Sequence, residues 1–431
     1  MSEAEVTRLL GEAQRARAGG RADVAEAKFR AVLALAPDHA GALNALGAGA
    51  LARQDAAAAA ELFERAANAE PSAPALWINL AKAKRLLGDG EGERHSLTRV
   101  LEIDQRHLVA LIRIAELHER LGEMDLATQR WSAVLALGTQ VYDRSAEFDA
   151  VLVHASAFVA ERTRRFGERI EESLGAGLAA ASSRDRRRFT AAVDHMLGRR
   201  AIFANQCAGL HYPFLPADEF FDREHFPWLA GLEAHTATIR EEFEALLAGG
   251  AAAFVPYVAM DKGVPDSKWA QLDHSRDWSA FHLWREGARI DEACARCPRT
   301  AEIVENLPLA RMESRAPTVF FSVLRPGTRI PPHTGVSNVR AIVHLPLVVP
   351  EGCGFRVGGE TRQWKVGEAF VFDDTIEHEA WNDSAELRAV LILDTWNPHL
   401  GPEERDLVGR LFALGEGDEP GATPGSLRLS D

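Results

Sequence analysis

The stretch that decides the fold runs from Phe320 to Trp396. It reads FFSVLRPGTRIPPHTG (320–335), VRAIVHLPLVVP (339–350) and GEAFVFDDTIEHEAWNDSAELRAVLILDTW (367–396). Short apolar runs rich in Val, Ile, Phe and Leu alternate with Pro-Gly, Gly-Gly and Asn-Asp pairs, which is typical of short strands joined by turns. Several such strands at close spacing predict a β-sandwich or a β-barrel.

Three polar side chains, His333, His378 and Arg388, lie within or at the ends of these apolar runs. Imidazoles from two different strands can hold one divalent metal, and iron(II) suits such ligands when other coordination positions stay open. A guanidinium inside a barrel is costly unless a carboxylate pairs with it, and its fork fits a carboxylate bidentately. The three residues indicate a metal beside a small dicarboxylic acid, as in an Fe(II)/2-oxoglutarate oxygenase. The alternative for Arg388 is a buried ion pair with Glu386 or Asp394.

The order and spacing of several motifs resemble the aspartyl/asparaginyl β-hydroxylase family. The resemblance spans about 203–402 and rests on Trp278-Ser279-Ala280-Phe281, His333-Thr334-Gly335, His344-Leu345-Pro346-Leu347, Phe372-Asp373-Asp374 through His378-Glu379, and Arg388. It implies a double-stranded β-helix, a jelly-roll or cupin-like barrel with flanking helices. It also implies an enzyme that uses Fe(II), 2-oxoglutarate and O₂ to hydroxylate an unactivated carbon. The implied target is the β-carbon of Asp or Asn in a peptide or protein, although related enzymes hydroxylate acyl chains on lipids.

By this resemblance, His333 and His378 are the metal ligands and Arg388 binds the far carboxylate of 2-oxoglutarate. Ser322 and His344 would then donate hydrogen bonds to a carboxylate of the co-substrate. From the residues alone, a serine or a histidine within an apolar strand is more often simply a core residue.

Three further positions concern the co-substrate pocket. Trp278 would form a wall of the pocket by the same resemblance. The family often has an arginine two residues before the histidine that matches His344, and this chain has Ile342 there. Arg340 lies two residues earlier, on the same face of the strand, and is the candidate replacement in co-substrate binding.

Gly335 occupies the position where common 2-oxoglutarate oxygenases have a metal-binding carboxylate, two residues after the first histidine. The resembled family also has glycine there, and a water takes the place of the carboxylate. Asp373 or Asp374 is the alternative source of an oxygen ligand, and a turn or a supporting hydrogen bond is the more ordinary role. The vacancy keeps a halogenase open as an alternative, because some 2-oxoglutarate-dependent halogenases bind halide at this place.

The first part of the chain, from residue 5 to residue 139, repeats with a period of 34 residues. The aligned columns are Leu46, Leu80 and Ile114; Gly20, Gln54, Gly88 and Gly122; Ala25, Ala59, Glu93 and Ala127; Phe29, Phe63, Leu97 and Trp131; and Val32, Ala66, Val100 and Val134. The pattern resembles about four tetratricopeptide repeats, which stack into a superhelix with a concave surface. Such an array usually binds a peptide or a protein, and here the expected partner is the substrate. A spacer or a dimerisation element is the alternative.

The chain is therefore predicted to be an α+β multidomain protein. Its predicted parts are the helical repeats (1–139), a helical connector (140–203), the oxygenase barrel (204–405), and a C-terminal helix with a flexible tail (406–431). In the connector, Arg184-Asp185-Arg186-Arg187-Arg188 follows Ser182 and Ser183, which are good N-cap residues. This cluster predicts a solvated helix start rather than a phosphate-binding patch. A Cys-Ala-Arg-Cys loop (294–297) is expected between the first strand and the core of the barrel.

The composition argues against several function classes. The chain has 49 basic and 63 acidic residues, a net charge of −14, which disfavours binding to nucleic acid or to an anionic membrane. The sequence has no run of about 18 apolar residues, so no membrane span is expected, and no signal peptide is visible. The four cysteines, with Cys294 and Cys297 as a lone CxxC pair, predict reduced structural thiols and a cytoplasmic protein, with a local disulfide or a redox role as the alternative.

Two other functions remain compatible with the sequence. One is a different enzyme on the same iron site: a lipid or free amino-acid hydroxylase, or a halogenase. The other is a repeat scaffold whose barrel has lost its activity. Ile342 favours the scaffold, whereas the presence of His333, His378 and Arg388 argues against it, since a decayed site has no reason to keep a buried arginine.

Overall fold

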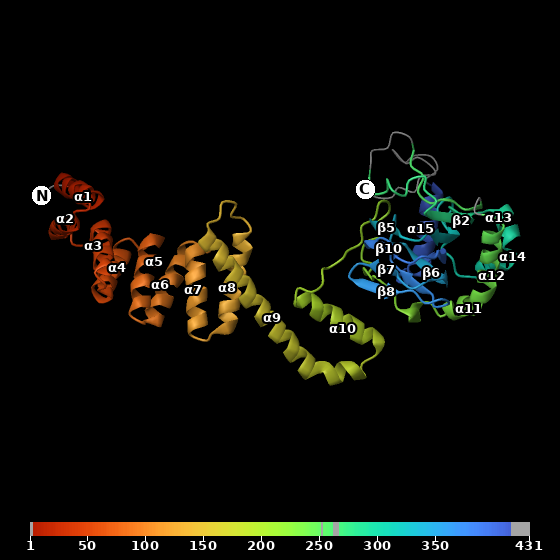
Figure 1. Cartoon of the computed structure of the whole chain (residues 1–431), viewed down its shortest axis with the longest axis horizontal. Helices are drawn as coiled ribbons and strands as arrows, with labels where there is room; N and C mark the ends of the chain where they lie inside the picture. The colour runs from red at the N-terminus through yellow and green to blue at the C-terminus, as the bar shows by residue number, and fades with distance from the viewer. Residues whose placement is uncertain (1–2, 251–252, 262–266, 415–431) are drawn as a thin grey trace. The chain divides into compact units, whose positions relative to one another are not determined.

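The structure is a computed structural model that describes residues 3–250, 253–261 and 267–414 (Figure 1). The chain divides into two compact units, Met1–Ala180 and Ala181–Asp431. Of the helices formed by the described residues, none combines the length and the apolar character that crossing a membrane requires.

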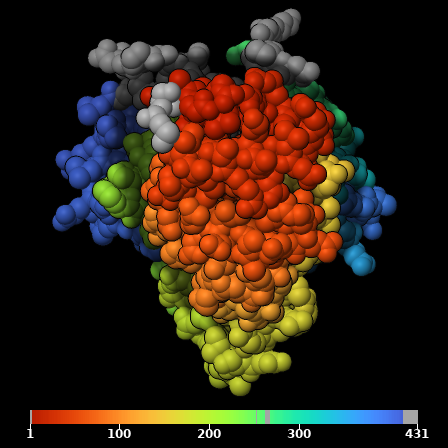
Figure 2. All heavy atoms as spheres, turned by 90° about the vertical axis from the view of Figure 1, so that its left-hand side faces the viewer, coloured from red at the N-terminus to blue at the C-terminus, as the bar shows by residue number. Residues whose placement is uncertain are grey.

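The first unit consists mainly of helix–turn–helix pairs, which confirms the predicted helical array. The pairs are α1 (Glu3–Ala18) with α2 (Ala22–Leu35), α3 (Ala40–Ala52) with α4 (Ala56–Ala69), α5 (Pro74–Leu86) with α6 (Gly90–Ile103), and α7 (Leu108–Arg120) with α8 (Met124–Gly138). In Figure 2 these helices, coloured red to orange, form one continuous packed surface. Each pair buries its apolar side against the next pair, as expected for a stacked repeat.

The 34-residue columns have direct structural roles in this unit. The large apolar column is fully buried, and its members are Phe29, Phe63, Leu97 and Trp131. A Cβ added at Gly47 of α3 would lie 2.7 Å from the ring of Phe63 in α4, so glycine allows these two helices to approach closely. The column at the turns is left-handed at every position, with φ of 72°, 65°, 73° and 73° at Gly20, Gln54, Gly88 and Gly122. Glycine adopts this conformation without steric cost, whereas the side chain of Gln54 makes it sterically unfavourable.

A long helix, α9 (Ala146–Ala180), follows the repeats and packs its first turns against α8. A Cβ at Gly138 would lie 2.6 Å from Leu152, and Arg162 lies 2.9 Å from Asp125. The next helix, α10 (Ser183–Met196), belongs to the second unit. The predicted connector is therefore divided between the two units rather than forming a region of its own.

The second unit contains two antiparallel sheets, which confirms that this part of the chain forms a β-rich domain. The larger sheet has the strand order β1-β2-β4-β11-β6-β9, with β3 paired to β2, and the smaller has the order β5-β10-β7-β8. The strands are β1 (Val255–Pro256), β2 (Trp278–Arg285), β3 (Ala288–Arg289), β4 (Val319–Leu324), β5 (Thr328–His333), β6 (Arg340–Val348), β7 (Cys353–Val357), β8 (Glu360–Gln363), β9 (Phe370–Phe372), β10 (His378–Asn382) and β11 (Arg388–Trp396).

The two faces of the larger sheet have different partners (Figure 1). Phe321 and Val323 of β4 join a core built with the helices, in which Phe243 lies 5.4 Å from Phe321. The alternate residues of the same strand, Phe320 and Leu324, join a second core shared with the smaller sheet. The helices of this unit are α11 (Leu229–Ala234), α12 (Thr236–Ala248), α13 (Asp291–Arg296), α14 (Pro298–Glu305) and α15 (Pro402–Leu414), with a 3₁₀ turn, η1 (Arg223–His225). The predicted site residues that belong to the larger sheet all lie on its inner face, which is directed toward the smaller sheet.

Two predictions about this unit need correction. The segment expected to be a Cys-Ala-Arg-Cys loop is helical up to Arg296, because Ala293 and Cys294 supply an apolar side that packs on β2. Cys294 and Cys297 are buried free thiols. The C-terminal helix begins at Pro402, where proline suits the first helical turn, rather than at residue 406. The predicted flexible tail, residues 415–431, lies outside the described residues.

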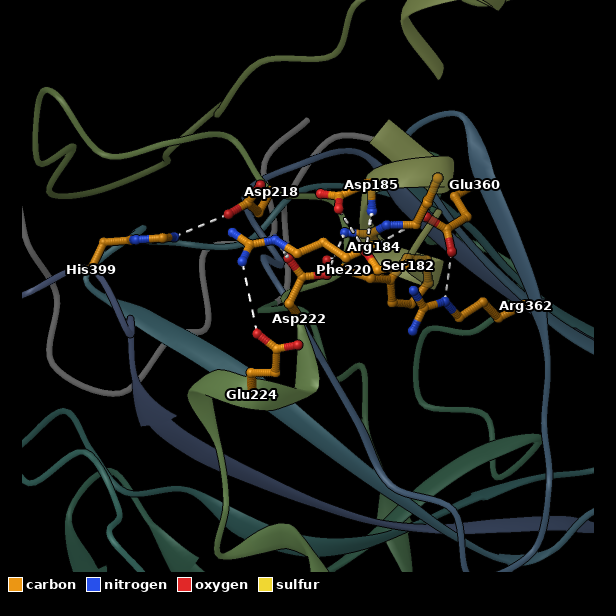
Figure 3. Close-up of polar contacts among 11 residues, drawn as sticks. Ser182, Arg184, Asp185, Asp218, Phe220, Asp222, Glu224, Glu360, Arg362 and His399 are labelled. Carbon is orange, nitrogen blue, oxygen red and sulfur yellow. Dashed lines mark hydrogen bonds and ion pairs between the residues drawn. The ribbon is translucent and has the colours of Figure 1, made fainter. Parts of the chain in front are cut away.

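The arginine cluster at the start of α10 differs from the predicted solvated helix start (Figure 3). Ser182 is the N-cap, as predicted, and accepts a hydrogen bond from the backbone N–H of Asp185. However, Arg184 Nε lies 2.7 Å from Asp222 Oδ2, and Arg187 bonds both Asp222 and the carbonyl of Phe220. These two arginines attach α10 to the sheet domain because the segment after residue 217 brings acidic groups to the helix.

Candidate metal and co-substrate site

The inner face of the larger sheet gathers the predicted co-substrate residues by strand register. Arg388, Val390 and Ile392 alternate along β11 and point to this face. Ser322 of β4 lies opposite Val390, and His344 of β6 lies opposite Ile392. Cross-strand partners share a face of the sheet, so Arg388, Ser322 and His344 lie on one surface.

The two predicted metal ligands meet on the smaller sheet. His333 ends β5, His378 begins β10, and the two are direct cross-strand partners with ring centroids 4.0 Å apart. In each ring, Nδ1 donates to the backbone carbonyl two residues earlier: Pro331 O at 2.8 Å and Ile376 O at 3.0 Å. A carbonyl only accepts, so Nδ1 carries the proton and the Nε2 lone pair stays free in both rings.

Burial keeps both imidazoles neutral. It lowers the pKa of His378 to about 4 and the pKa of His333 well below its ordinary value, with the neighbouring imidazole adding to the effect at His333. A neutral imidazole is the form that binds a metal. Among the described residues, no group of three or more His, Cys, Asp or Glu side chains is placed to hold a metal ion. The side-chain ligands offered at this place are therefore the two histidines.

Asp374 fills the space beside Gly335. A Cβ built on Gly335 would overlap the Asp374 carboxyl group, and the Gly335 N–H donates to the Asp374 carbonyl at 2.6 Å. Asp374 is 8% exposed and its Oδ1 has no hydrogen-bond partner. Burial raises its pKa to about 7, against the opposing effect of Arg340. The carboxyl group absent from residue 335 is thus replaced in space by one from the β9–β10 loop.

Arg388 is a buried cation with no anionic partner among the described residues. It is 2% exposed, its Nε has no hydrogen bond, and burial lowers its pKa to about 10. The alternative of an ion pair with Asp394 is wrong, because Asp394 accepts from Arg340 at 2.9 Å and from the Thr318 N–H. An unpaired buried donor costs about 1–3 kcal/mol, and more when it is charged. A bound anion would remove this cost.

Ser322 of β4 and Trp278 of β2 form a hydrogen-bonded pair on the same face of the sheet as Arg388. The indole N–H of Trp278 donates to Ser322 Oγ at 3.2 Å, so the serine hydroxyl proton remains available to another acceptor. Trp278 is stacked on Tyr257 with ring centroids 4.0 Å apart. Both Trp278 and Ser322 are buried, which makes a hydrogen-bonding ligand the natural partner of that proton.

The structure gives Arg340 a partner of its own. Arg340 NH1 donates to Asp394 Oδ2 at 2.9 Å, a diagonal pair across β6 and β11. Ile342, where the resembled family often has arginine, is 8% exposed and packs in the core between the sheets. The role of Arg340 in co-substrate binding stays a prediction, and its charge is already neutralised by Asp394.

Trp364 is an aromatic residue of this region that was not predicted from the sequence. Its ring lies parallel to that of His344, with centroids 5.4 Å apart and 10° between the planes, and Arg388 Cζ lies 5.0 Å from its centre. His344 Nδ1 and Trp364 Nε1 are buried without hydrogen-bond partners. The only signal in the sequence is one tryptophan in the polar stretch ETRQWK (360–365).

Asn205 was also missed, and it supports the loop that leads to His378. Its Nδ2 donates to Asp373 Oδ2 at 2.7 Å and to Thr375 Oγ1 at 2.9 Å. Asp373 in turn accepts from the Thr375 N–H and hydroxyl, which is a turn role. Burial raises the pKa of Asp373 to about 6.

A separate cavity of about 250 Å³ lies beside α10, lined in part by Arg184, Arg187, Arg223 and Arg362. Each of these arginines has a carboxylate within ion-pair distance: Asp222 for Arg184 and Arg187, Glu233 for Arg223, and Glu360 for Arg362. Figure 3 shows Asp222 and Glu360 beside the arginines at this place. The cavity is therefore nearly neutral, in contrast to the surroundings of Arg388.

Comparison with known proteins places this domain among characterised sequences. The family model described as "Aspartyl/Asparaginyl beta-hydroxylase" matches residues 233–398. The human protein "Aspartyl/asparaginyl beta-hydroxylase" is 41% identical over 135 residues, which is 31% of this chain and 18% of that protein. "Aspartate beta-hydroxylase domain-containing protein 2" of Xenopus tropicalis is 34% identical over 210 residues, 47% of this chain and 54% of that protein.

A third relative has a different substrate in its name. "Ornithine lipid ester-linked acyl 2-hydroxylase" of Rhizobium tropici is 32% identical over 196 residues, 45% of this chain and 66% of that protein. Among solved structures, MamA aligns with 41% of this chain and with 96% of its own length, at 14% identity and a TM-score of 0.33. This chain thus spans between 18% and 66% of the length of the three relatives.

The fold and the site define an antiparallel two-sheet domain with a pair of neutral histidines and an unpaired buried arginine. Residues 233–398 match the family model, and this domain is similar to the aspartyl/asparaginyl β-hydroxylases among the relatives. The resemblance predicted from the sequence motifs is confirmed.

Proposed function

We propose that this protein is an Fe(II)- and 2-oxoglutarate-dependent dioxygenase that hydroxylates the β-carbon of an Asp or Asn side chain in a peptide or protein. The observation that supports it most is the unpaired, buried Arg388 on one sheet, combined with two histidines whose Nε2 atoms are free on the facing sheet. A divalent metal and a dicarboxylate satisfy both, and the facing sheets suit a double-stranded β-helix.

The residues present fit this metal and this co-substrate. His333 and His378 would hold iron(II) through Nε2, since both Nδ1 atoms are committed to backbone carbonyls. The bound metal would supply the chemistry by which 2-oxoglutarate, O₂ and a C–H bond become succinate, CO₂ and a C–OH group. Arg388 would take the far carboxylate of 2-oxoglutarate as a bidentate ion pair, and the Ser322 hydroxyl would donate to the same carboxylate.

The surrounding residues would orient these groups and exclude water. Trp269 packs its ring edge-on to His333 with centroids 5.0 Å apart, and Phe372 does the same to His378 at 5.2 Å. This apolar surround holds the imidazoles in one orientation and shields the reaction from solvent. Asp374, with a pKa of about 7, is able to hold or release a proton beside Gly335. It would accept a hydrogen bond from a water that replaces the missing carboxylate ligand.

The choice of a peptide substrate draws support from the relatives and from the first unit. Two of the three relatives reported above bear aspartyl, asparaginyl or aspartate hydroxylation in their names. The repeat array has the architecture of peptide-binding solenoids, and we propose that it recruits the substrate. A second candidate, hydroxylation of a lipid acyl chain, is favoured by the relative from Rhizobium tropici, which matches 45% of this chain.

Halogenation and loss of activity are less well supported. The Asp374 carboxyl group occupies the space beside Gly335, and an anionic carboxylate there would repel a halide. A scaffold without activity would gain from replacing Arg388 by an apolar residue, because the buried unpaired cation lowers stability. Product mass separates hydroxylation from chlorination directly.

The test is an anaerobic titration of the metal-free protein with Fe(II) and 2-oxoglutarate, followed by the visible charge-transfer absorption of the complex. We expect the band in wild type, its loss in His378→Ala and a large weakening in Arg388→Ala. Circular dichroism checks that each variant is folded. A folded wild-type protein that gives no band would refute the oxygenase and leave a peptide-binding scaffold.

A further inference from the structure

Trp364 touches two of the residues that are expected to bind the co-substrate, His344 and Arg388. Its ring is stacked on His344, and its face lies 5.0 Å from Arg388 Cζ. All three side chains are buried, with 7%, 6% and 2% exposure for Trp364, His344 and Arg388. Trp364 comes from the segment after β8, on the smaller sheet, whereas His344 and Arg388 lie on the larger one.

Three buried nitrogen atoms in this cluster lack hydrogen-bond partners: Arg388 Nε, His344 Nδ1 and Trp364 Nε1. One such atom is unusual in a native core, and three on Trp364 and the two side chains that it contacts indicate one missing polar partner. In the tautomer with the proton on His344 Nδ1, all three nitrogens are donors, and the missing partner then has several acceptor oxygens. A carboxylate offers about four acceptor sites and therefore suits this cluster.

An indole face attracts a guanidinium without neutralising it. An aspartate in the place of Trp364 would hold Arg388 equally well, but it would compete with a carboxylate ligand for the same cation. Asp394 has that effect on Arg340, which it binds at 2.9 Å. The ring of Trp364 therefore keeps Arg388 in position and leaves its charge available.

We propose that Trp364 is a positioning residue of the 2-oxoglutarate pocket, which holds Arg388 and His344 toward the far carboxylate and thereby selects a dicarboxylic over a monocarboxylic 2-oxo acid. This inference rests on the proposed function and goes beyond it by naming the residue that sets the choice of co-substrate.

The test compares binding of 2-oxoglutarate with binding of 2-oxopentanoate, which has the same five-carbon chain and a methyl group in place of the far carboxylate. Dissociation constants are measured by anaerobic calorimetry on the Fe(II)-loaded full chain, so that no turnover is needed. The variants are Trp364→Leu, which removes the ring, and Trp364→Phe, which keeps a ring with a weaker π face and no N–H. Trp381→Leu is the matched control, because Trp381 lies on the same small sheet under another arginine, Arg329, at 5.8 Å.

We expect Trp364→Leu to weaken 2-oxoglutarate binding about tenfold, the size of a desolvated cation–π contact, and to leave 2-oxopentanoate binding within about twofold. Trp364→Phe should lie between the wild type and Trp364→Leu, and it provides the answer if Trp364→Leu does not fold. In an Arg388→Ala background, Trp364→Leu should have little further effect, because the two residues act as a unit.

Equal weakening of both acids would mean a merely structural role and would overturn the inference, as would an unchanged preference for 2-oxoglutarate. Loss of preference in Trp381→Leu as well would also refute it, since the effect would not be specific to Trp364. If the wild type shows no preference for 2-oxoglutarate, the proposed function itself fails. A failure confined to the Trp364 variants is thus distinguishable from a failure of the oxygenase assignment.

Discussion

A Cβ on Gly335 would overlap Asp374 Oδ2, so no side chain fits at residue 335 without moving the carboxyl group of Asp374. Gly335 follows the metal-ligand candidate His333 by two residues, and Asp374 precedes His378 by four. Glycine is required here by space rather than by backbone conformation, since Gly335 is not among the glycines with positive φ. Where common 2-oxoglutarate oxygenases have a carboxylate two residues after the first histidine, this chain has the carboxyl group of Asp374 from the β9–β10 loop.

The first prediction follows from this arrangement. Gly335→Asp should fold poorly and bind Fe(II) about tenfold more weakly than wild type, because two carboxyl groups then compete for one space. The double variant Gly335→Asp with Asp374→Gly should recover the affinity, which equilibrium titration with Fe(II) measures. If Gly335→Asp alone binds Fe(II) more tightly than the double variant, the two side chains do not compete.

The second prediction concerns the unpaired cation. Arg388→Met should raise the free energy of unfolding of the protein without ligand by about 1–4 kcal/mol, as happens when buried charges are replaced by apolar groups. The same substitution should abolish binding of 2-oxoglutarate. Urea unfolding measures the first effect, and calorimetry measures the second. Lower stability of the variant without ligand would indicate that Arg388 has a partner in the folded protein.

The third prediction is a pH dependence. His282 is stacked on Phe320, and burial lowers its pKa to about 4. The unfolded chain takes up this proton near pH 6.5, before the folded protein does. The contribution of His282 to stability is therefore complete above about pH 6.5 and is lost as the pH falls toward 4. His282→Phe should gain about 1–3 kcal/mol relative to wild type between pH 7 and pH 4.5, at ~1.4 kcal/mol per pKa unit. A constant difference across this range would contradict the assignment.

The fourth prediction concerns the repeat array. Gln54 adopts φ of 65° at a turn where the other three repeats have glycine. Gln54→Gly should stabilise the array by about 0.5–1 kcal/mol, because glycine has no steric penalty there. The matched control, Gly88→Ala, should destabilise the array by a similar amount, as read from thermal unfolding. Opposite signs for the two substitutions are required.

The fifth prediction separates the arginines at the start of α10. Arg187 bonds Asp222 and the Phe220 carbonyl and lies 3.3 Å from Glu360, whereas Arg186 is exposed. Arg187→Ala should cost about 1–2 kcal/mol and increase hydrogen exchange in α10, since a half-buried donor set is lost. Arg186→Ala should change stability by less than about 0.5 kcal/mol. Equal effects of the two would mean that the ion pairs do not hold the helix.

The regular features of this chain were predictable because they rest on short-range periodicity. The 34-residue repeat places its large apolar column in the core whatever the exact helix ends are. Alternation along a strand likewise predicts that Arg340, Ile342 and His344 share one face. Neither inference needs to know which strands are neighbours.

The features that were missed depend on contacts between distant segments. The pairing of Arg340 with Asp394 joins residues 54 apart and follows from the register of β6 against β11, which no local pattern encodes. Trp364 follows a short edge strand, where nothing periodic indicates that its ring points toward Arg388. The solvated start expected for α10 was wrong for the same reason, because Asp222 arrives from another segment.

His333 and His378 each donate a hydrogen bond to the backbone carbonyl two residues earlier, and this affects how the site can evolve. A backbone carbonyl is present whatever side chain the residue has, so no substitution elsewhere in the pocket removes either acceptor. The orientation of each imidazole is inherited with its own three-residue segment. Residues around the site are thus free to diverge toward new substrates while the two histidines proposed to bind the metal keep their orientation. This is a form of mutational robustness that a designer of altered specificity can exploit.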